Sequence, residues 1–257
     1  MRAVVALWRR EIVRFLRQRS RVIGSLAQPV VFWLLLGGGL SASFRPGPAG
    51  STPSYLEYFY AGSLALVLLF TAIFATISVV EDRRSGFLQG VLVAPISRTT
   101  IVLGQALGAT TLGVGQGVLF LLLAPLAGIR LGATMFAGSV AASTLVAFGL
   151  TNVGLMIAWR MESTQGFHAI MNLVLLPIWF LSGAFFPPGG LPAPLQAVMA
   201  LDPLTYGVGL LRHALYAGHP ALTADLPSLV LCLGVSAAFA LGSLGLATAT
   251  ARRSGVL

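Results

Sequence analysis

The side chains that could do chemistry in this 257-residue sequence are seven acidic residues, three histidines and one cysteine. Every acidic residue lies at the end of a long apolar run or between two runs, at Glu11, Glu57, Glu81, Asp82, Glu162, Asp202 and Asp225. His168, His213 and His219 are too far apart for the ligand spacing of a zinc site. No GxSxG elbow accompanies the serines. We therefore expect no catalytic centre and no metal site.

The basic residues are sixteen arginines, and the sequence has no lysine. A phosphate-binding loop of the GxxxxGK type needs a lysine, so these residues cannot bind ATP by that device. Cys232 lies in an apolar run, where we expect a small buried hydrophobic side chain. A single cysteine supplies neither a disulfide nor a thiolate metal site. We therefore predict no cofactor in this chain.

The densest group of charges is Glu81, Asp82, Arg83 and Arg84, which directly follows an apolar run. Four consecutive charges cannot lie in hydrocarbon, so they mark the point where this run meets water. The segment that follows, residues 86–92, places apolar side chains on one face of a short helix, which Pro95 ends before Arg98. The face consists of Phe87, Leu88, Val91 and Leu92. Such a face is a surface that another protein could hold.

Composition places this charged segment in a membrane protein. Only 9 % of the residues are charged, 56 % are hydrophobic and the mean hydropathy is +0.89, whereas a soluble domain would be about 25 % charged. The arginines are spread over loops and are not gathered on one basic face, which argues against nucleic acid as a partner. We predict an all-α protein with six spans, at residues 22–40, 58–80, 100–127, 133–158, 165–186 and 228–250.

The first 21 residues predict an amphipathic helix on the membrane surface, because arginines and apolar side chains fall largely on opposite helical faces. The alternative is a secretory signal with its apolar core at 22–40 and a cleavage site near residues 41–43. With both termini in the cytoplasm, thirteen of the sixteen arginines lie inside, against Arg45, Arg130 and Arg212 outside. We expect this orientation in a bacterial cytoplasmic (inner) membrane.

The outer stretch at residues 187–221 has two short apolar segments, 195–201 and 206–216, which Asp202 and Pro203 separate. Each is too short to cross a bilayer and too apolar for a solvated loop, so we expect re-entrant or interfacial helices. An outer lid without a role in transport is the alternative.

Four glycines, at positions 104, 108, 113 and 117, form two GxxxG spacings in the third span. Such spacings let another helix approach closely. The partner helix belongs either to the same subunit or to a second subunit.

Three stretches together resemble the type-2 ABC exporter permeases, the membrane subunits related to daunorubicin and nodulation-factor exporters. They are EDRRSGFLQGVLVAPISR at 81–98, NLVLLPIWFLSGAFFP at 172–187 and DPLTYGVGLLRHAL at 202–215. The resemblance covers most of the chain. It implies a cytoplasmic ABC ATPase subunit in two copies that carries ATP and magnesium, and a second permease copy that forms a homodimer.

The resemblance also assigns roles to residues. The segment at 81–98 would be the coupling loop that docks on the ATPase, through Glu81, Asp82, Arg83, Arg84, Gly86, Phe87, Leu88, Val91, Leu92, Pro95 and Arg98. The outer stretch would close the exit, through Pro187, Asp202, Pro203, Tyr206 and Arg212. The chain would be one permease domain over residues 1–257, divided into the surface helix 1–21, spans 22–80, the coupling loop 81–98, spans 99–186, the outer segment 187–221, and the last span with its tail at 222–257.

The resemblance implies export of an amphipathic drug, a lipid or a lipid-linked glycan. Polysaccharide export by the same family is an alternative. An ATP-independent carrier would need an ionisable group in mid-membrane, and no acidic residue falls there. A membrane scaffold that transports nothing is the third possibility.

Overall fold

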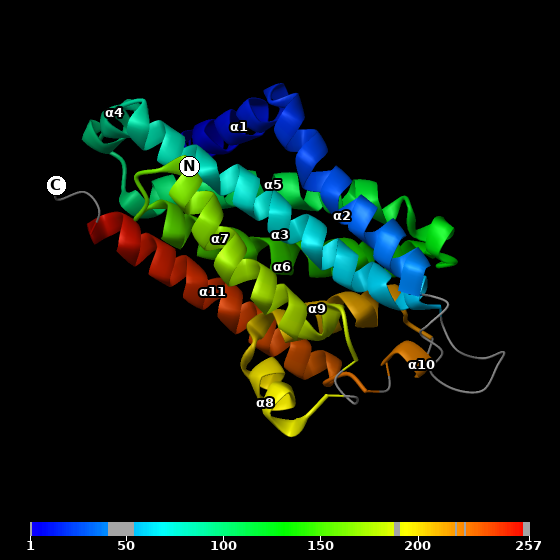
Figure 1. Ribbon diagram of the computed structural model, residues 1–257. Coiled ribbons are helices and arrows are strands. Elements are labelled where there is room, and N and C mark those ends of the chain that lie inside the picture. Colours follow the sequence, from blue (N-terminus) through cyan, green and yellow to red (C-terminus); the bar gives the residue numbers. More distant parts are fainter. Residues whose placement is uncertain (1, 41–53, 188–190, 219, 224, 254–257) are drawn as a thin grey trace.

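The computed structural model describes residues 2–40, 54–187, 191–218, 220–223 and 225–253. Within these ranges the chain is helical and has no strand, so the prediction of an all-α protein is confirmed (Figure 1). The predicted outer loop around Arg45, the possible cleavage site at 41–43 and His219 lie outside the described residues.

Six helices in the described residues are long and apolar enough to cross a membrane, as predicted. They are α2 (Arg19–Leu40), α3 (Tyr55–Arg84), α5 (Arg98–Leu121), α6 (Ala133–Ala158), α7 (Thr164–Trp179) with its continuation η2 (Phe180–Ala184), and α11 (Leu229–Arg253). Helix α3 is longer than the predicted span, because it continues as regular helix through Glu81–Arg84. The third span is shorter than predicted, since the chain leaves α5 at Leu121 and forms η1 (Ala124–Ala127).

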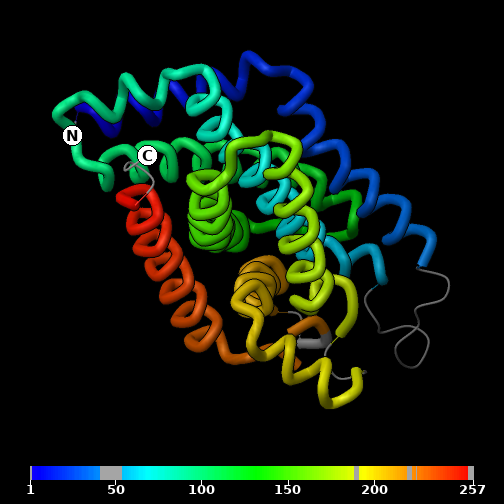
Figure 2. Tube along the Cα trace, turned by 60° about the vertical axis from the view of Figure 1, so that its left-hand side comes forward, coloured from blue at the N-terminus to red at the C-terminus, as the bar shows by residue number. Residues whose placement is uncertain are grey.

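The shorter helices are α1 (Arg2–Arg17), α4 (Phe87–Val93), α8 (Ala193–Leu201), α9 (Pro203–Leu215) and α10 (Pro220–Thr223). Helix α1 is shorter than the predicted helix over residues 1–21, because it ends at Arg17 and α2 starts at Arg19. At the break, the Gln18 carbonyl accepts from the backbone N–H groups of Arg21 and Val22, which starts the new helix. The break lets α2 leave in a different direction from α1 (Figures 1 and 2).

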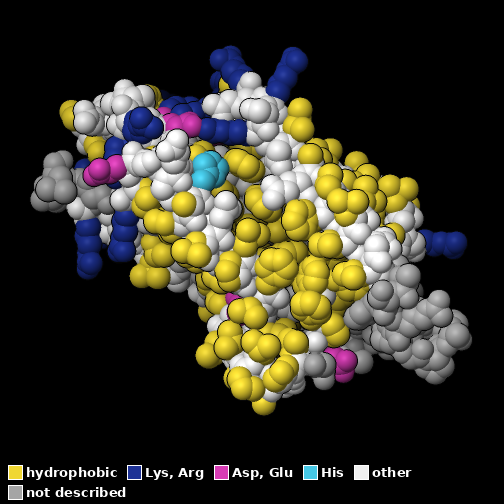
Figure 3. Space-filling model, viewed as in Figure 1, with side chains coloured by type: hydrophobic (Ala, Val, Ile, Leu, Met, Phe, Trp, Pro, Cys, Tyr) yellow, Lys and Arg dark blue, Asp and Glu magenta, His cyan; other side chains and the backbone are white. Residues whose placement is uncertain are grey.

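Helix α3 forms the centre of the bundle. Nearly all of its residues from Tyr55 to Val80 are buried, because α2, α5, α6, α7 and α9 pack around it. A helix that is apolar on all sides requires such a position. Helices α1 and α4 and the carboxyl end of α11 lie at one end of the bundle, and α8, α9 and α10 lie at the other (Figures 1 and 2). Arginine side chains gather at the first of these ends, which we call the basic end (Figure 3).

The glycines of the third span pack against other helices of the same chain. A Cβ atom at Gly104 would come within 2.7 Å of the Leu7 Cβ, and one at Gly108 within 2.7 Å of the Glu11 Cβ, so α1 lies directly against α5. Gly113 faces Ala147 of α6, and Gly117 faces Leu68 of α3. These contacts support the first of the two readings of the GxxxG spacings, packing within one subunit.

A leucine at Gly108 should therefore push α1 away from α5 and destabilise the protein by about 1–3 kcal/mol, the usual cost of overpacking. The matched control is Gly115→Leu on the same helix, where an added Cβ meets nothing within 4 Å. The measurement is the thermal unfolding midpoint in detergent. Equal midpoints for the two variants would show that α1 does not pack as described.

Candidate functional site

The acidic residues at the carboxyl end of α3 are held by arginines from α1. Asp82 is buried and accepts two parallel hydrogen bonds from the Arg10 guanidinium, each 2.6 Å long. Arg14 adds a third contact, from Nη1 to the Asp82 Oδ1 at 2.5 Å. Two guanidinium groups on one carboxylate form the strong, bidentate type of ion pair that a buried charge requires. Asp82 therefore fixes α1 to the end of α3.

Glu81 extends this cluster to the start of α2. Its Oε2 accepts from the Arg14 Nη2 at 2.7 Å, and its other oxygen accepts from Arg21. Arg14 thus bridges both carboxylates, and one acidic pair ties three helices together. Arg83 turns the other way and donates to the carbonyls of Trp159 at 2.5 Å and of Met161 at 3.4 Å, at the end of α6. We call Arg10, Arg14, Arg21, Glu81 and Asp82 the basic-end ion cluster.

Glu11 lies beside this cluster and is a buried carboxyl on the Gly108 side of α1. Burial raises its pKa, and the negative charge of Asp82 adds to that shift, while a hydrogen bond with Ser78 and the Arg10 and Arg14 charges oppose it. Folding thus strengthens proton binding by this carboxyl, at the position where α1 contacts α5. The sequence predicts only that Glu11 lies outside the spans, because the pattern does not reveal which helix covers it.

Helix α4 follows a turn in which Gly86 adopts a φ of 76°, a left-handed conformation that glycine tolerates. The predicted apolar face is divided between the interior and the surface: Leu88 is buried, Val91 and Leu92 pack partly against the core, and Phe87 is exposed. The Arg10 guanidinium lies 3.9 Å from the centre of the Phe87 ring. The ion cluster therefore also contacts α4.

An open groove lies between α1 and α4. Its volume is about 460 Å³, and its walls are almost wholly apolar, from Ala3, Ala6, Leu7, Phe87, Gly90, Val91, Ala94 and Ile96. Val93 at the end of α4 is a further exposed apolar side chain, at 87 %. Pro95 and Ser97 follow, and the Ser97 hydroxyl accepts from the Thr100 N–H to cap α5 next to Arg98. Residues of α1 and of the predicted coupling loop at 81–98 thus line one common groove.

The predicted outer residues lie at the opposite end of α3 and so form a separate site. Asp202 caps α9, with its Oδ1 accepting from the Leu204 N–H at 2.9 Å. The Tyr206 hydroxyl donates to the Ala200 carbonyl at 2.9 Å and ties α9 to α8. Burial raises the pKa of Asp202 to about 7. Pro203 starts α9, and Pro187 lies beyond the end of η2.

Arg212 on α9 is 2 % exposed and reaches two other helices. Its Nη2 donates to the Gly183 carbonyl at 2.8 Å, and the Tyr58 hydroxyl donates to the same oxygen at 3.0 Å. The guanidinium lies 4.1 Å from the centre of the Tyr58 ring. Gly183 has a φ of 75°, so this contact holds the irregular end of α7. Arg212 therefore joins α9 to η2 and to the start of α3.

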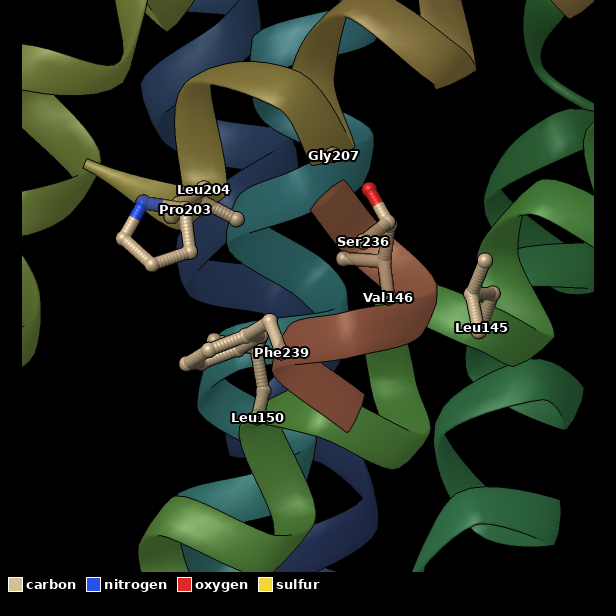
Figure 4. Close-up of a pocket in the computed structure, with 8 residues that line it drawn as sticks. All are labelled: Leu145, Val146, Leu150, Pro203, Leu204, Gly207, Ser236 and Phe239. Atoms are coloured by element: carbon tan, nitrogen blue, oxygen red, sulfur yellow. The ribbon is translucent and has the colours of Figure 1, made fainter. Parts of the chain in front are cut away.

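Helix α9 is also wedged between α6 and α11. A cavity of about 10 Å³, near the size of one water molecule, remains where the three helices meet (Figure 4). Its lining is apolar except for the Ser236 hydroxyl, and it consists of Leu145, Val146, Leu150, Pro203, Leu204, Gly207, Ser236 and Phe239. The three helices therefore pack closely at this point.

Removing the charge of Asp82 should loosen α1. Asp82→Asn removes the one carboxylate that Arg10 and Arg14 share, and we expect a loss of about 2 kcal/mol together with faster proteolysis within α1. The measurements are the thermal midpoint and the rate of limited proteolysis. Arg84→Gln is the control, since Arg84 is an exposed neighbour. Equal behaviour of the two variants would contradict the role given to the cluster.

Asp202 should give the protein a dependence on pH. Because its carboxyl pKa rises from 3.8 to about 7 on folding, the folded state binds the proton more tightly, and stability falls as the pH rises between these values. Asp202→Asn keeps a good helix cap without a titrating group. From pH 5 to pH 7 the melting temperature should fall more in the wild-type protein than in this variant. If the melting temperatures of the two proteins changed with pH in parallel, a raised pKa of Asp202 would be ruled out.

Comparison with known proteins gives consistent matches. A family model described as ABC-2 type transporter matches residues 2–216, which include every helix from α1 to α9. Nodulation protein J of Rhizobium leguminosarum bv. viciae is 29 % identical over 242 residues, 91 % of this chain and 90 % of that protein. Its counterpart in R. leguminosarum bv. trifolii is 30 % identical over 225 residues, 85 % and 82 % of the two chains. A protein of Cyanophora paradoxa named "Putative transport permease ycf38" is 28 % identical over 212 residues, 80 % and 71 % of the two chains.

Proposed function

The chain belongs to the ABC-2 type transporter family, and we propose that it forms the passage of an ATP-driven exporter in a bacterial cytoplasmic membrane. It is a multi-pass membrane protein and a transport permease subunit. In the proposed orientation the basic end faces the cytoplasm, which agrees with the excess of arginines there (Figure 3). Both termini would then be cytoplasmic.

Energy would come from a separate ABC ATPase chain, with ATP and magnesium bound on that subunit. The absence of lysine from these 257 residues, and hence of a GxxxxGK loop, supports this division of labour. We infer two ATPase copies beneath two permease copies, most simply a homodimer. A path between two subunits suits a chain whose six candidate spans are few to enclose one.

The observation that carries the proposal is the apolar groove between α1 and α4, which lies against the ion cluster. An ATPase bound there would contact Phe87, Val93 and the start of α1 together. Because Arg10 contacts both Phe87 and Asp82, a push on α4 would reach α3 directly. A displacement of α4 would therefore move α3, and not only the turn that joins α3 to α4.

The cargo would be an amphipathic drug, a lipid or a lipid-linked glycan, and polysaccharide is the alternative within the same class. Exposed apolar side chains on α2 and α7, such as Leu35 and Leu173, suit an amphipathic cargo and equally suit contact with lipid or a second subunit. The α8–α9 pair would close the exit, held by Arg212 and Asp202. An ATP-independent carrier would move solute in vesicles without the ATPase, and a scaffold would not change ATPase activity.

Docking can be tested at exposed positions of α4. Phe87→Ser with Val93→Asp should reduce co-purification of a co-expressed ABC ATPase subunit at least about tenfold, because each substitution removes an apolar side chain from the proposed interface. Leu88 is unsuitable because it is buried, so its substitution would disturb folding. The control is Leu126→Asp, an exposed leucine in η1 at the other end of the bundle. Normal co-purification and transport by the double variant, with its melting temperature unchanged, would exclude this docking surface.

A further inference from the structure

A second groove lies at the basic end, between α5 and α11. It is formed by the first turn of α5 and the last three turns of α11, and its volume is about 540 Å³. The lining residues are Thr99, Leu241, Leu244, Gly245, Thr248, Ala249, Arg252 and Arg253. The groove is open, and the proposed docking of an ATPase between α1 and α4 does not use it.

The groove is polar at one end and apolar along its length. Arg252 and Arg253 lie in the last turn of α11, and the Arg252 Nη2 donates to the Thr99 hydroxyl at 3.2 Å. Within the described residues, neither arginine has an ion pair with an acidic side chain, whereas Arg10, Arg14 and Arg21 all do. Among the described residues, no carboxylate therefore balances the two guanidinium groups that line the groove. This end suits an anion.

The apolar part runs deeper along α11. Leu241 lies eleven residues before Arg252, a distance of about 16 Å along a helix, so it lies well inside the hydrocarbon layer when Arg252 is at its surface. Leu241 is 68 % exposed, and a Cβ atom added at Gly245 would meet nothing within 4 Å. Open space therefore lies over Gly245, beside Leu241 and Leu244, on the stretch of α11 that the hydrocarbon layer would surround.

We propose that this groove binds an anionic phospholipid, with the phosphate on Arg252 and Arg253 and one acyl chain along Leu241, Leu244 and Gly245. A basic pocket between membrane helices at the interface suits such a headgroup. The bound lipid would join the start of α5 to the end of α11, directly after the α4–α5 connection. The proposal depends on the membrane-spanning assignment and not on the ATPase, so either can fail while the other stands.

The test measures lipid retained by the whole protein. The wild-type chain is purified in mild detergent from vesicles of phosphatidylglycerol and phosphatidylcholine, and bound lipid is counted by native mass spectrometry. Arg252→Gln with Arg253→Gln should lower phosphatidylglycerol retention about tenfold or more, and leave phosphatidylcholine unchanged. Gly245→Phe should do the same by occupying the open space over Gly245, while keeping both charges.

The matched control is Arg17→Gln with Arg19→Gln, which removes two exposed charges at the α1–α2 turn of the same end. This variant should retain phosphatidylglycerol like the wild type. An equal loss in the control would show a general attraction to the basic end and overturn the site. Unchanged retention in either groove variant, or equal binding of the two lipids by the wild type, would also overturn it.

Discussion

The rest of the structure depends on the ion pairs that Asp82 makes with Arg10 and Arg14. A carboxylate this deeply buried is costly unless opposite charges and hydrogen bonds surround it, and both arginines come from α1. The amphipathic first helix is therefore a structural part of the bundle end and more than a membrane anchor. Because α1 packs directly on Gly104 and Gly108 of α5, its arginine side chains lie close enough to Asp82 to bind it.

The end of α3 opposite to Asp82 carries a comparable anchor. There Arg212 of α9 lies over the Tyr58 ring and donates to the Gly183 carbonyl, which joins α9 to η2 and α3. From Tyr58 to Asp82 is about 36 Å along one continuous, buried helix. Helix α3 thus connects two arginine-held joints, one below the proposed docking groove and one at the proposed exit. Helix α3 is therefore a rigid element that would transmit a displacement from the basic end to the opposite end of the bundle.

Local sequence patterns account for much of this architecture. Apolar runs of spanning length predicted the six spans, and Gly86 and Pro95 bounded α4 closely. The ion cluster could not be predicted in this way, because Asp82 and its partner Arg10 are 72 positions apart and no helical or strand period relates them. The amphipathic pattern of α4 also could not tell its inner from its outer side, and Leu88 proved to be buried. Tertiary packing decides both.

A charge exchange between Arg10 and Asp82 tests the central claim most directly, that force enters α3 through this pair. The readout is stimulation of the partner ATPase by the permease in lipid vesicles. Arg10→Asp and Asp82→Arg should each abolish stimulation, and the two together should restore a substantial part of it, since the bond is re-formed with its charges reversed. Full stimulation in both single variants, or no recovery in a well-folded double variant, would contradict the account.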